Sequence, residues 1–573
     1  MATPINAAPS AAFSLVRQIV TARSLAALVF LAVLATGVWA WRTTPVDAFP
    51  DITPPLVQVF TTTDGLSPQE VERYVTFPVE TVMSGLPGVR QVRSNSSFGL
   101  SVVTVYFEDG TDIYLARQLV SERLAAARDA IPDGFGEPEL GPLASGLGQV
   151  LFYYLDSADG DLIGLRTVQD WLVKLDLQTV PGVTEVLSLG GFERQYQVNV
   201  RPQALVQFDL SMSQVVTALE RANLNAGAQY IVENGEQYTV RAEGLLQGEA
   251  DLRQVVVKAV DGVPVLMSQI AEIAVGGAPR QGLATMNGEG EVVAGLVLKL
   301  IGANTTAVIE GVQARLDAIN AALPDGVVAR PYYDQSELVG QAVSTMTTAL
   351  WQGALLVGLV LMVFMGGWRP GLIVAASIPF SVAFALIAMR GFGVSVNLMS
   401  LGGIAIAIGM MVDGAVVIVE NARRHVSETA HSDRASVIAG AVTEVLKPLS
   451  VSIAIVMLVF LPILTLQGVE GKTFRPLAFS VILAMAGSLV FALVIAPSAS
   501  RFLKVSRAQV VSAGRIDRLM GQAIGFFVGR RSLAAGLAAV MLLMGGLAYT
   551  RLGSEFSPRL NEGDILVRLT MAS

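Results

Sequence analysis

Residues 397–424 read NLMSLGGIAIAIGMMVDGAVVIVENARR, and this stretch decides the fold of the chain. From Leu398 to Val419 it is apolar apart from Ser400 and Asp413. At 1.5 Å per residue, a helix of this length crosses the roughly 30 Å of a bilayer core. The stretch is therefore predicted to be a membrane-spanning helix with one acid near its middle.

Asp413 is the residue of this span whose presence most needs an explanation. Ionisable side chains at that depth are costly, and they mostly face a bundle interior or a water path, as parts of proton relays or ion sites. Glu420 follows two turns later, on nearly the same face at about 100° per residue. We predict that the two acids form a proton path. The alternative for Asp413 is a structural pair with a lysine on another helix. The alternative for Glu420 is that it snorkels to the interface or pairs there, one turn from Arg423 and Arg424.

The composition is that of an integral membrane protein. Of the 573 residues, 52% are hydrophobic and 15% charged, and the mean hydropathy is +0.56. The formal charge of −8 includes no basic block, so no nucleic-acid partner is expected. There is no cysteine, and the only histidines, His425 and His431, are interpreted as solvated residues of the cytoplasmic loop between the fourth and fifth spans. Methionine is then the main soft metal ligand left.

The hydropathy pattern divides the chain into spans and one large insert. A cytoplasmic segment, 1–23, precedes a first span at 24–41, which is interpreted as a retained anchor because it ends in two tryptophans. A soluble insert at 42–338 follows. Arginine and lysine cluster in alternate later connections, which places those on the cytoplasmic side and the insert in the periplasm. After the insert we predict further spans at 342–365, 371–390, 397–421, 447–466, 477–499 and 532–550. A cytoplasmic linker is predicted at 500–531, and the start of a second periplasmic insert at 551–573.

The insert begins with the element order of a ferredoxin-like unit. The predicted strand, helix, strand, strand and helix lie at 57–63, 67–84, 89–97, 100–107 and 111–131. The tripeptide at 87–89 recurs at 181–183, each time after a helix and before two strands, which predicts a second copy. The motif at 109–112, DGTD, is interpreted as a turn and helix cap rather than a calcium loop.

A larger repeat appears near the end of the chain. Residues 531–535, RSLAA, repeat residues 23–27, and the similarity continues beyond each span. Six spans and one insert are therefore expected to form one repeat, with a second repeat beginning. Parallel repeats of this kind are typical of transporters. We expect the chain to be about half of such a protein and to be inactive alone.

Three motifs together resemble the heavy-metal efflux branch of the resistance-nodulation-division (RND) superfamily. They are PVDAFPDI at 45–52, FEDGTD at 107–112 and VDGAVVIVEN at 412–421. The resemblance implies an α+β membrane protein: a helical bundle of one six-helix repeat plus a seventh helix, and periplasmic ferredoxin-like porter subdomains. A docking subdomain is expected at about 187–278.

The same resemblance implies a function and partners. It implies a proton antiporter of the bacterial inner membrane that exports metal cations without a permanently bound cofactor. It also implies a homotrimer when complete, which works with a periplasmic adaptor and an outer-membrane channel. Multidrug members commonly carry two adjacent acids in the fourth span. In this chain Asp413 is followed by Gly414 instead, which favours a metal substrate over a drug. A multidrug exporter and a non-transporting membrane scaffold are the alternatives.

Methionines suggest which metal is carried. Copper and silver members place methionines along the fourth and sixth spans, and the corresponding positions here are Met399, Met411 and Met485. At two further positions where the copper and silver members have methionine, this chain has Ile418 and Ser500, so the series of thioethers is incomplete. Copper or silver is the substrate that this pattern favours.

Helix geometry makes Met410 a fourth candidate ligand. At 100° per residue, Met399, Met410 and the two acids fall within about 80° of one another, whereas Met411 points elsewhere. Met410 and Met411 are therefore both candidates. The alternative is that these methionines are adaptable core filler.

Four glycines are expected to keep the acid-bearing span slim. Small residues let membrane helices approach closely. These glycines are Gly402, Gly403, Gly409 and Gly414.

Overall fold

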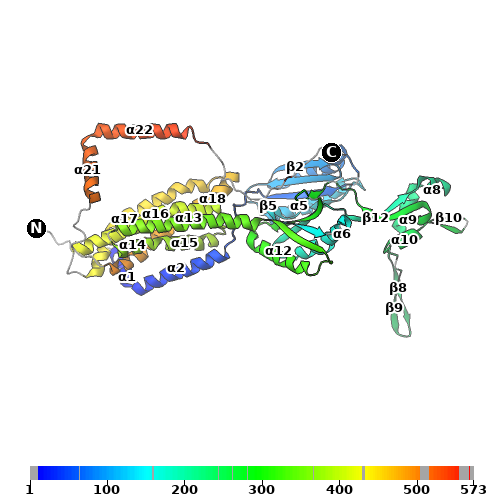
Figure 1. Ribbon diagram of the computed structural model, residues 1–573, viewed down its shortest axis with the longest axis horizontal. Helices are drawn as coiled ribbons and strands as arrows, with labels where there is room; N and C mark the ends of the chain where they lie inside the picture. Colours follow the sequence, from blue (N-terminus) through cyan, green and yellow to red (C-terminus); the bar gives the residue numbers. More distant parts are fainter. Residues whose placement is uncertain are drawn as a thin grey trace. The chain divides into compact units, whose positions relative to one another are not determined.

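A computed structural model describes most of the chain (Figure 1). The described residues are 11–63, 65–157, 160–242, 244–260, 262–280, 282–288, 290–365, 367–428, 433–503, 515–553 and 567. The chain divides into two compact units, each of which is described separately. The first comprises residues 1–147, 302–306 and 335–573, and the second comprises residues 148–301 and 307–334.

Among the described residues, seven helical segments of the first unit are long and apolar enough to cross a membrane. The chain is therefore a membrane protein. The segments are α2 (Arg23–Thr43), α13 (Gln335–Phe364), α14 (Trp368–Ala375) continued by α15 (Ser377–Gly391), α16 (Leu398–Glu428), α17 (Arg434–Leu464), α18 (Gly468–Val490) continued by η3 (Phe491–Ile495), α19 (Ala496–Ala499) and η4 (Ser500–Phe502), and α22 (Arg531–Tyr549). Two further helices are α1 (Ala11–Thr21) and α21 (Arg515–Gly529).

Helices α16 and α18 form the centre of the bundle. In each of them 56% of the span is buried, against 11% for α17 and 6% for α13. Met411 of α16 and Met485 of α18 belong to one hydrophobic cluster with residues of α15 and α17. The Ser488 hydroxyl of α18 also donates a hydrogen bond to the Met411 carbonyl oxygen. The acid-bearing helix is thus held from one side by its neighbours.

Within the described part of the chain, two of the four glycines in α16 face another helix. A Cβ on Gly403 would lie 2.5 Å from the Leu477 carbonyl oxygen of α18, so any larger residue there would force the helices apart. Gly414 lies against Ile453 of α17 and Ala492 of η3. By contrast, a Cβ on Gly402 or Gly409 would meet no atom of a neighbouring described helix within 4 Å. The expectation that the glycines allow close helix approach is therefore met at Gly403 and Gly414, and for Gly402 and Gly409 it stays a prediction.

The first unit also contains a four-stranded antiparallel sheet. Its strand order is β2-β3-β1-β4, which is the ferredoxin-like arrangement predicted from the sequence. Buried valines of β1 and β3, such as Val59 and Val105, pack against α4 and α5. The elements are β1 (Leu56–Thr62), α3 (Pro68–Val71), η1 (Glu72–Thr76), α4 (Phe77–Met83), β2 (Val89–Ser97), β3 (Leu100–Phe107), α5 (Ile113–Ala130) and β4 (Pro138–Leu140).

The second unit repeats this arrangement with an interruption. Its five-stranded sheet contains the order β6-β14-β5-β15, with the short β13 also paired to β14, so β14 takes the place that β3 has in the first copy. The strand that follows β6 in the chain, β7 (Arg194–Val200), pairs instead with β12 (Ala271–Gly277). The two strands expected after 181–183 are therefore not partners. The other elements are β5 (Ala144–Ser157), α6 (Leu162–Val168), η2 (Gln169–Val173), α7 (Lys174–Leu177), β6 (Val183–Leu189), β13 (Ala284–Thr285), β14 (Glu291–Leu300), α12 (Thr305–Asn320) and β15 (Val327–Asp334).

Residues 194–277 form an insertion between β6 and β14 with a core of its own. Leu210, Val215, Met267 and Ile270 are buried together in that core. The insertion falls within the range where the resemblance placed a docking subdomain. Its elements besides β7 and β12 are α8 (Pro202–Gln207), α9 (Met212–Ala222), β8 (Ala226–Glu233), β9 (Glu236–Ala242), α10 (Glu249–Gln254), β10 (Val256–Val260), β11 (Val263–Leu266) and α11 (Met267–Ile270).

The contrast between neighbouring glycines gives a stability prediction. We expect Gly403→Ala to destabilise the protein by about 1–3 kcal/mol, because overpacking at the α16–α18 contact forces backbone movement. The matched control, Gly402→Ala on the open side of the same helix, should be neutral or slightly stabilising because alanine is the better helix former. Denaturant titration in mild detergent measures both. Equal effects of the two substitutions would contradict the close contact at Gly403.

Candidate functional site

One face of α16 is left uncovered by the rest of the described chain. The exposed residues recur every three or four positions, while the opposite face is buried. We name this face the acidic stripe, because both acids of the span lie on it. Its members are Ala405, Ile406, Gly409, Asp413, Val417, Glu420 and Arg424.

Asp413 lies in the middle of the acidic stripe. Among the described residues, none forms a hydrogen bond or ion pair with its carboxylate. The alternative of a structural pair with a lysine therefore has no support in this part of the chain. The adjacent Gly414 points the other way, into the bundle. The carboxylate thus faces outward from a helix whose back is fixed by packing.

Glu420 differs from Asp413 because it has a partner. It lies about 10 Å further along the helix axis, and its Oε1 is 3.0 Å from Nη2 of Arg423. Arg423 also donates through Nη1 to the Met365 carbonyl oxygen at the end of α13, at 2.8 Å. Next to them, Asn421 donates to the Ala441 carbonyl oxygen of α17, at 2.8 Å. The end of α16 is therefore tied to two neighbouring helices through these polar groups.

The structure separates the four candidate methionines into two pairs. Met411 and Met485 are almost wholly buried in the hydrophobic cluster of the helix bundle. Met399 and Met410 are half-buried, and Met410 packs against the edge of that cluster. Met411 and Met485 therefore share one buried cluster, and Met410 lies at its edge.

His425 is not the free loop residue that the sequence suggested. It lies within α16, which continues to Glu428, and its Nε2 is 3.4 Å from Oε2 of Glu444 on α17. Its Nδ1 lies 3.1 Å from the Asn421 carbonyl oxygen. The helix continues because no breaker follows the span. His431 lies outside the described residues, and within the described part no three acidic, histidine or cysteine side chains form a metal-binding group.

The motif at 45–52 joins the beginning of α16 to the soluble part of the first unit. Val46 forms a parallel bridge with Val396, where the Asp47 amide donates to the Val396 carbonyl oxygen at 3.0 Å. Two residues further, the Leu398 amide donates to the Ala48 carbonyl oxygen at 3.2 Å. The segment that leads into β1 is thus bonded to the residues that lead into α16.

Lys472 makes the corresponding connection for α18, and sequence reasoning missed it. Its Nζ donates to the Thr53 carbonyl oxygen at 2.6 Å and lies 3.3 Å from Oδ1 of Asp109. Asp112 caps α5 by accepting from the Tyr114 amide, as the sequence predicted, but Asp109 pairs with α18. The sequence feature that could have revealed this contact is a lysine in the first turns of an otherwise apolar helix. Both central helices therefore hold the soluble part through their first residues.

The connection through Lys472 gives a second prediction. We expect Lys472→Met to cost more stability than Asp109→Asn, because the lysine also satisfies the Thr53 carbonyl oxygen. The two changes together should cost less than their sum by about 0.5–1 kcal/mol, as for other partly exposed ion pairs. Denaturant titration of both single variants and the double variant measures this coupling. The exposed Lys447 provides the control Lys447→Met, and strict additivity would contradict the pair.

Comparisons with known proteins identify relatives over nearly the whole chain. A model of the AcrB/AcrD/AcrF family matches residues 12–573. The chain is 41% identical over 561 residues to the protein HelA of Legionella pneumophila, which covers 94% of this chain and 53% of HelA. It is 39% identical over 568 residues to the cobalt-zinc-cadmium resistance protein CzcA of Cupriavidus metallidurans, with coverage of 94% and 53%.

Two further comparisons agree with these. The chain is 37% identical over 571 residues to the cation efflux system protein CusA of Escherichia coli, which covers 96% of this chain and 54% of CusA. A crystal structure of a heavy metal efflux pump superposes with a TM-score of 0.83 at 34% identity, covering 96% of this chain and 53% of that one. The chain spans about half the length of the curated relatives it matches.

Proposed function

The chain belongs to the AcrB/AcrD/AcrF family, whose members are RND transporters, and from this premise we propose that it exports heavy-metal cations by proton antiport. Its relatives include proteins named for cation efflux and for cobalt, zinc and cadmium resistance. The observation that carries the proposal is Asp413, a mid-membrane acid on an exposed helix face without a partner among the described residues. An ionisable group placed there at such cost is expected to have a function.

Asp413 is suited to carry the proton. Removing a carboxylate from water favours its neutral form, so a group near mid-membrane changes its charge readily when its surroundings change. In the assembled pump, further membrane helices cover the acidic stripe and supply the opposing charge. Glu420 lies toward the cytoplasmic end of the same face, where its pairing with Arg423 makes it an exit group.

Movement of α16 and α18 couples the proton to the periplasmic part. Both helices are fixed to each other by the Gly403 contact and to the soluble part by Val396 and Lys472. A change of charge at Asp413 that shifts α16 therefore pulls on the segment leading into β1. This arrangement can transmit movement because packed helices shift as units rather than deforming.

The proton path gives a third prediction. In proteoliposomes containing the full-length protein, Asp413→Asn should abolish metal-driven proton flux, because the amide cannot exchange a proton. Asp413→Glu should retain part of the flux, and Glu420→Gln should retain flux with an altered pH profile. The control is Glu470→Gln, which removes an exposed acid near the start of α18. Undiminished flux in Asp413→Asn would refute the proposal, and an unaltered profile in Glu420→Gln would remove that residue from the path.

For the choice of metal we propose copper or silver. Met411 of α16 and Met485 of α18 both belong to the buried cluster of the bundle, and thioether sulfur suits a soft monovalent ion better than a harder divalent one. Ile418 and Ser500 stand where a longer series of methionines would continue. Met399, Met411 and Met485 are thus the part of the series that this chain retains, and the last two lie in the buried cluster.

The methionine pair gives a fourth prediction. The double variant Met411→Leu, Met485→Leu keeps volume and hydrophobicity, so it should leave the fold intact. We expect it to lower resistance of a pump-deletion strain to copper and silver and to leave any resistance to cobalt, zinc and cadmium unchanged. Met389→Leu, at a buried methionine of α15 in the same cluster, is the matched control. If the double variant behaves like this control for every metal, the methionines are core filler.

The setting of the pump follows from the same proposal. We place it in the bacterial inner membrane with the soluble units in the periplasm, as the distribution of basic residues indicates. It acts as a homotrimer with a periplasmic adaptor and an outer-membrane channel, and residues 194–277 make the docking surface for that assembly.

A further inference from the structure

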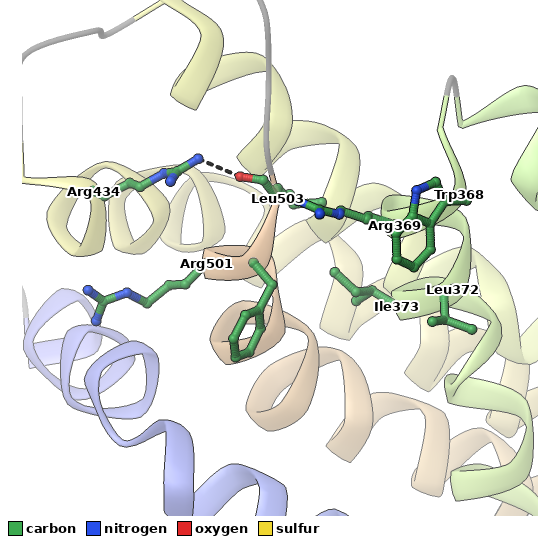
Figure 2. A pocket seen from close by; sticks show the side chains of 8 residues that line it. Trp368, Arg369, Leu372, Ile373, Arg434, Arg501 and Leu503 are labelled. Atoms are coloured by element: carbon green, nitrogen blue, oxygen red, sulfur yellow. Dashed lines mark hydrogen bonds between the residues drawn. The ribbon is translucent and has the colours of Figure 1, made fainter.

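A cavity of about 470 Å³ lies at the end of the bundle opposite Lys472, where α14 and α17 begin and η4 ends (Figure 2). It is formed within the first unit, and neither Asp413 nor Glu420 lines it. Its lining residues are Trp368, Arg369, Leu372, Ile373, Arg434, Arg501, Phe502 and Leu503.

The charged residues that line this cavity are all positive. They are Arg369, Arg434 and Arg501, which come from three different helical segments. The acid next to Arg434 in the chain, Asp433, is already engaged: it accepts from the Ser436 hydroxyl at 2.9 Å and lies 3.4 Å from Arg17. The described lining therefore carries no carboxylate to neutralise the three guanidinium groups.

Two of the three guanidinium groups flank Leu503. Figure 2 shows Arg434 and Arg369 on either side of it, while the side chain of Arg501 is directed away. Arg434 donates to the Leu503 carbonyl oxygen. Arg369 lies 5.3 Å from the Trp368 ring, a cation–π contact that holds the guanidinium beside the indole. These contacts use only part of the donor capacity, because each guanidinium carries five N–H groups.

The remaining lining is apolar and open to the surroundings. Trp368 is 63% exposed, Phe502 62% and Leu372 51%, although all three belong to membrane-spanning segments. Exposed apolar side chains at the end of a span contact acyl chains, and tryptophan prefers the boundary between chains and headgroups. The cavity therefore offers arginine on one side and hydrocarbon contact on the other.

We propose that this cavity binds the headgroup of an anionic phospholipid of the cytoplasmic leaflet. Guanidinium groups recognise phosphate oxygens through paired N–H donors, and basic pockets between membrane helices bind such headgroups. A free phosphate would satisfy the arginines but would leave Trp368, Leu372 and Phe502 without a partner. Bound lipid would join α14, α17 and η4 at the membrane surface.

Brominated lipids test the site, because bromine on an acyl chain quenches tryptophan fluorescence at contact. The full-length protein in detergent is titrated with brominated phosphatidylglycerol or brominated phosphatidylcholine. Subtracting the signal of a Trp368→Phe variant isolates Trp368 from the other tryptophans. We expect phosphatidylglycerol to quench Trp368 at much lower concentration than phosphatidylcholine. Equal quenching by the two lipids would overturn the proposal.

Variants of the two flanking arginines assign the binding. Arg369→Gln and Arg434→Gln should each weaken phosphatidylglycerol binding about fivefold, as expected for loss of one basic contact with an anionic headgroup. Arg369→Lys and Arg434→Lys keep the charge and should retain most of the affinity, which separates loss of binding from loss of fold. Lys447→Gln, outside the cavity, should have no effect. An equal loss in this control would overturn the assignment.

Inorganic phosphate distinguishes a lipid from a soluble anion. Phosphate carries the headgroup charge without acyl chains, so it should leave quenching by phosphatidylglycerol unchanged at matched ionic strength. Displacement of the lipid by phosphate alone would identify a soluble anion as the occupant and overturn the lipid assignment.

Discussion

A carboxylate near the middle of a membrane helix constrains everything around it. The bilayer core offers no water to solvate Asp413, so either another group must oppose its charge or the charge must be removed by a proton. The structure meets this constraint by packing the back of α16 tightly and leaving the acid on the acidic stripe. Gly403 and Gly414 allow neighbouring helices to pack closely against the other side of α16, so a change of charge at Asp413 acts on a helix that moves together with its neighbours.

The predictable features were those that local pattern determines. The apolar runs located the spans, and the alternation of strands and helices predicted the ferredoxin-like order of the first sheet, which the structure confirms. The pairing of β7 was not predictable, because a strand's partner is set by the whole sheet and not by its neighbours in sequence. His425 was misjudged for a similar reason: nothing local shows that α17 brings Glu444 alongside it.

The candidate site was predictable only in part. Asp413 and Glu420 stand out in the sequence because acids are rare in such helices, and the sequence also offered pairing of Glu420 with the neighbouring arginines, which the structure shows with Arg423. Lys472 and the arginine-lined cavity were missed because their members come from segments far apart in the chain. Charged residues are common at helix ends, and their function can be inferred only from the atoms that they contact in the structure.

The interrupted sheet of the second unit has a consequence for how the protein is made. Strand β6 emerges from the ribosome long before β14, its partner, because residues 194–277 are synthesised in between. At about 5–20 residues per second the delay is on the order of ten seconds. An unpaired strand edge invites aggregation during that time. The insertion has its own core and can fold first, so its early collapse would bring β6 and β14 together.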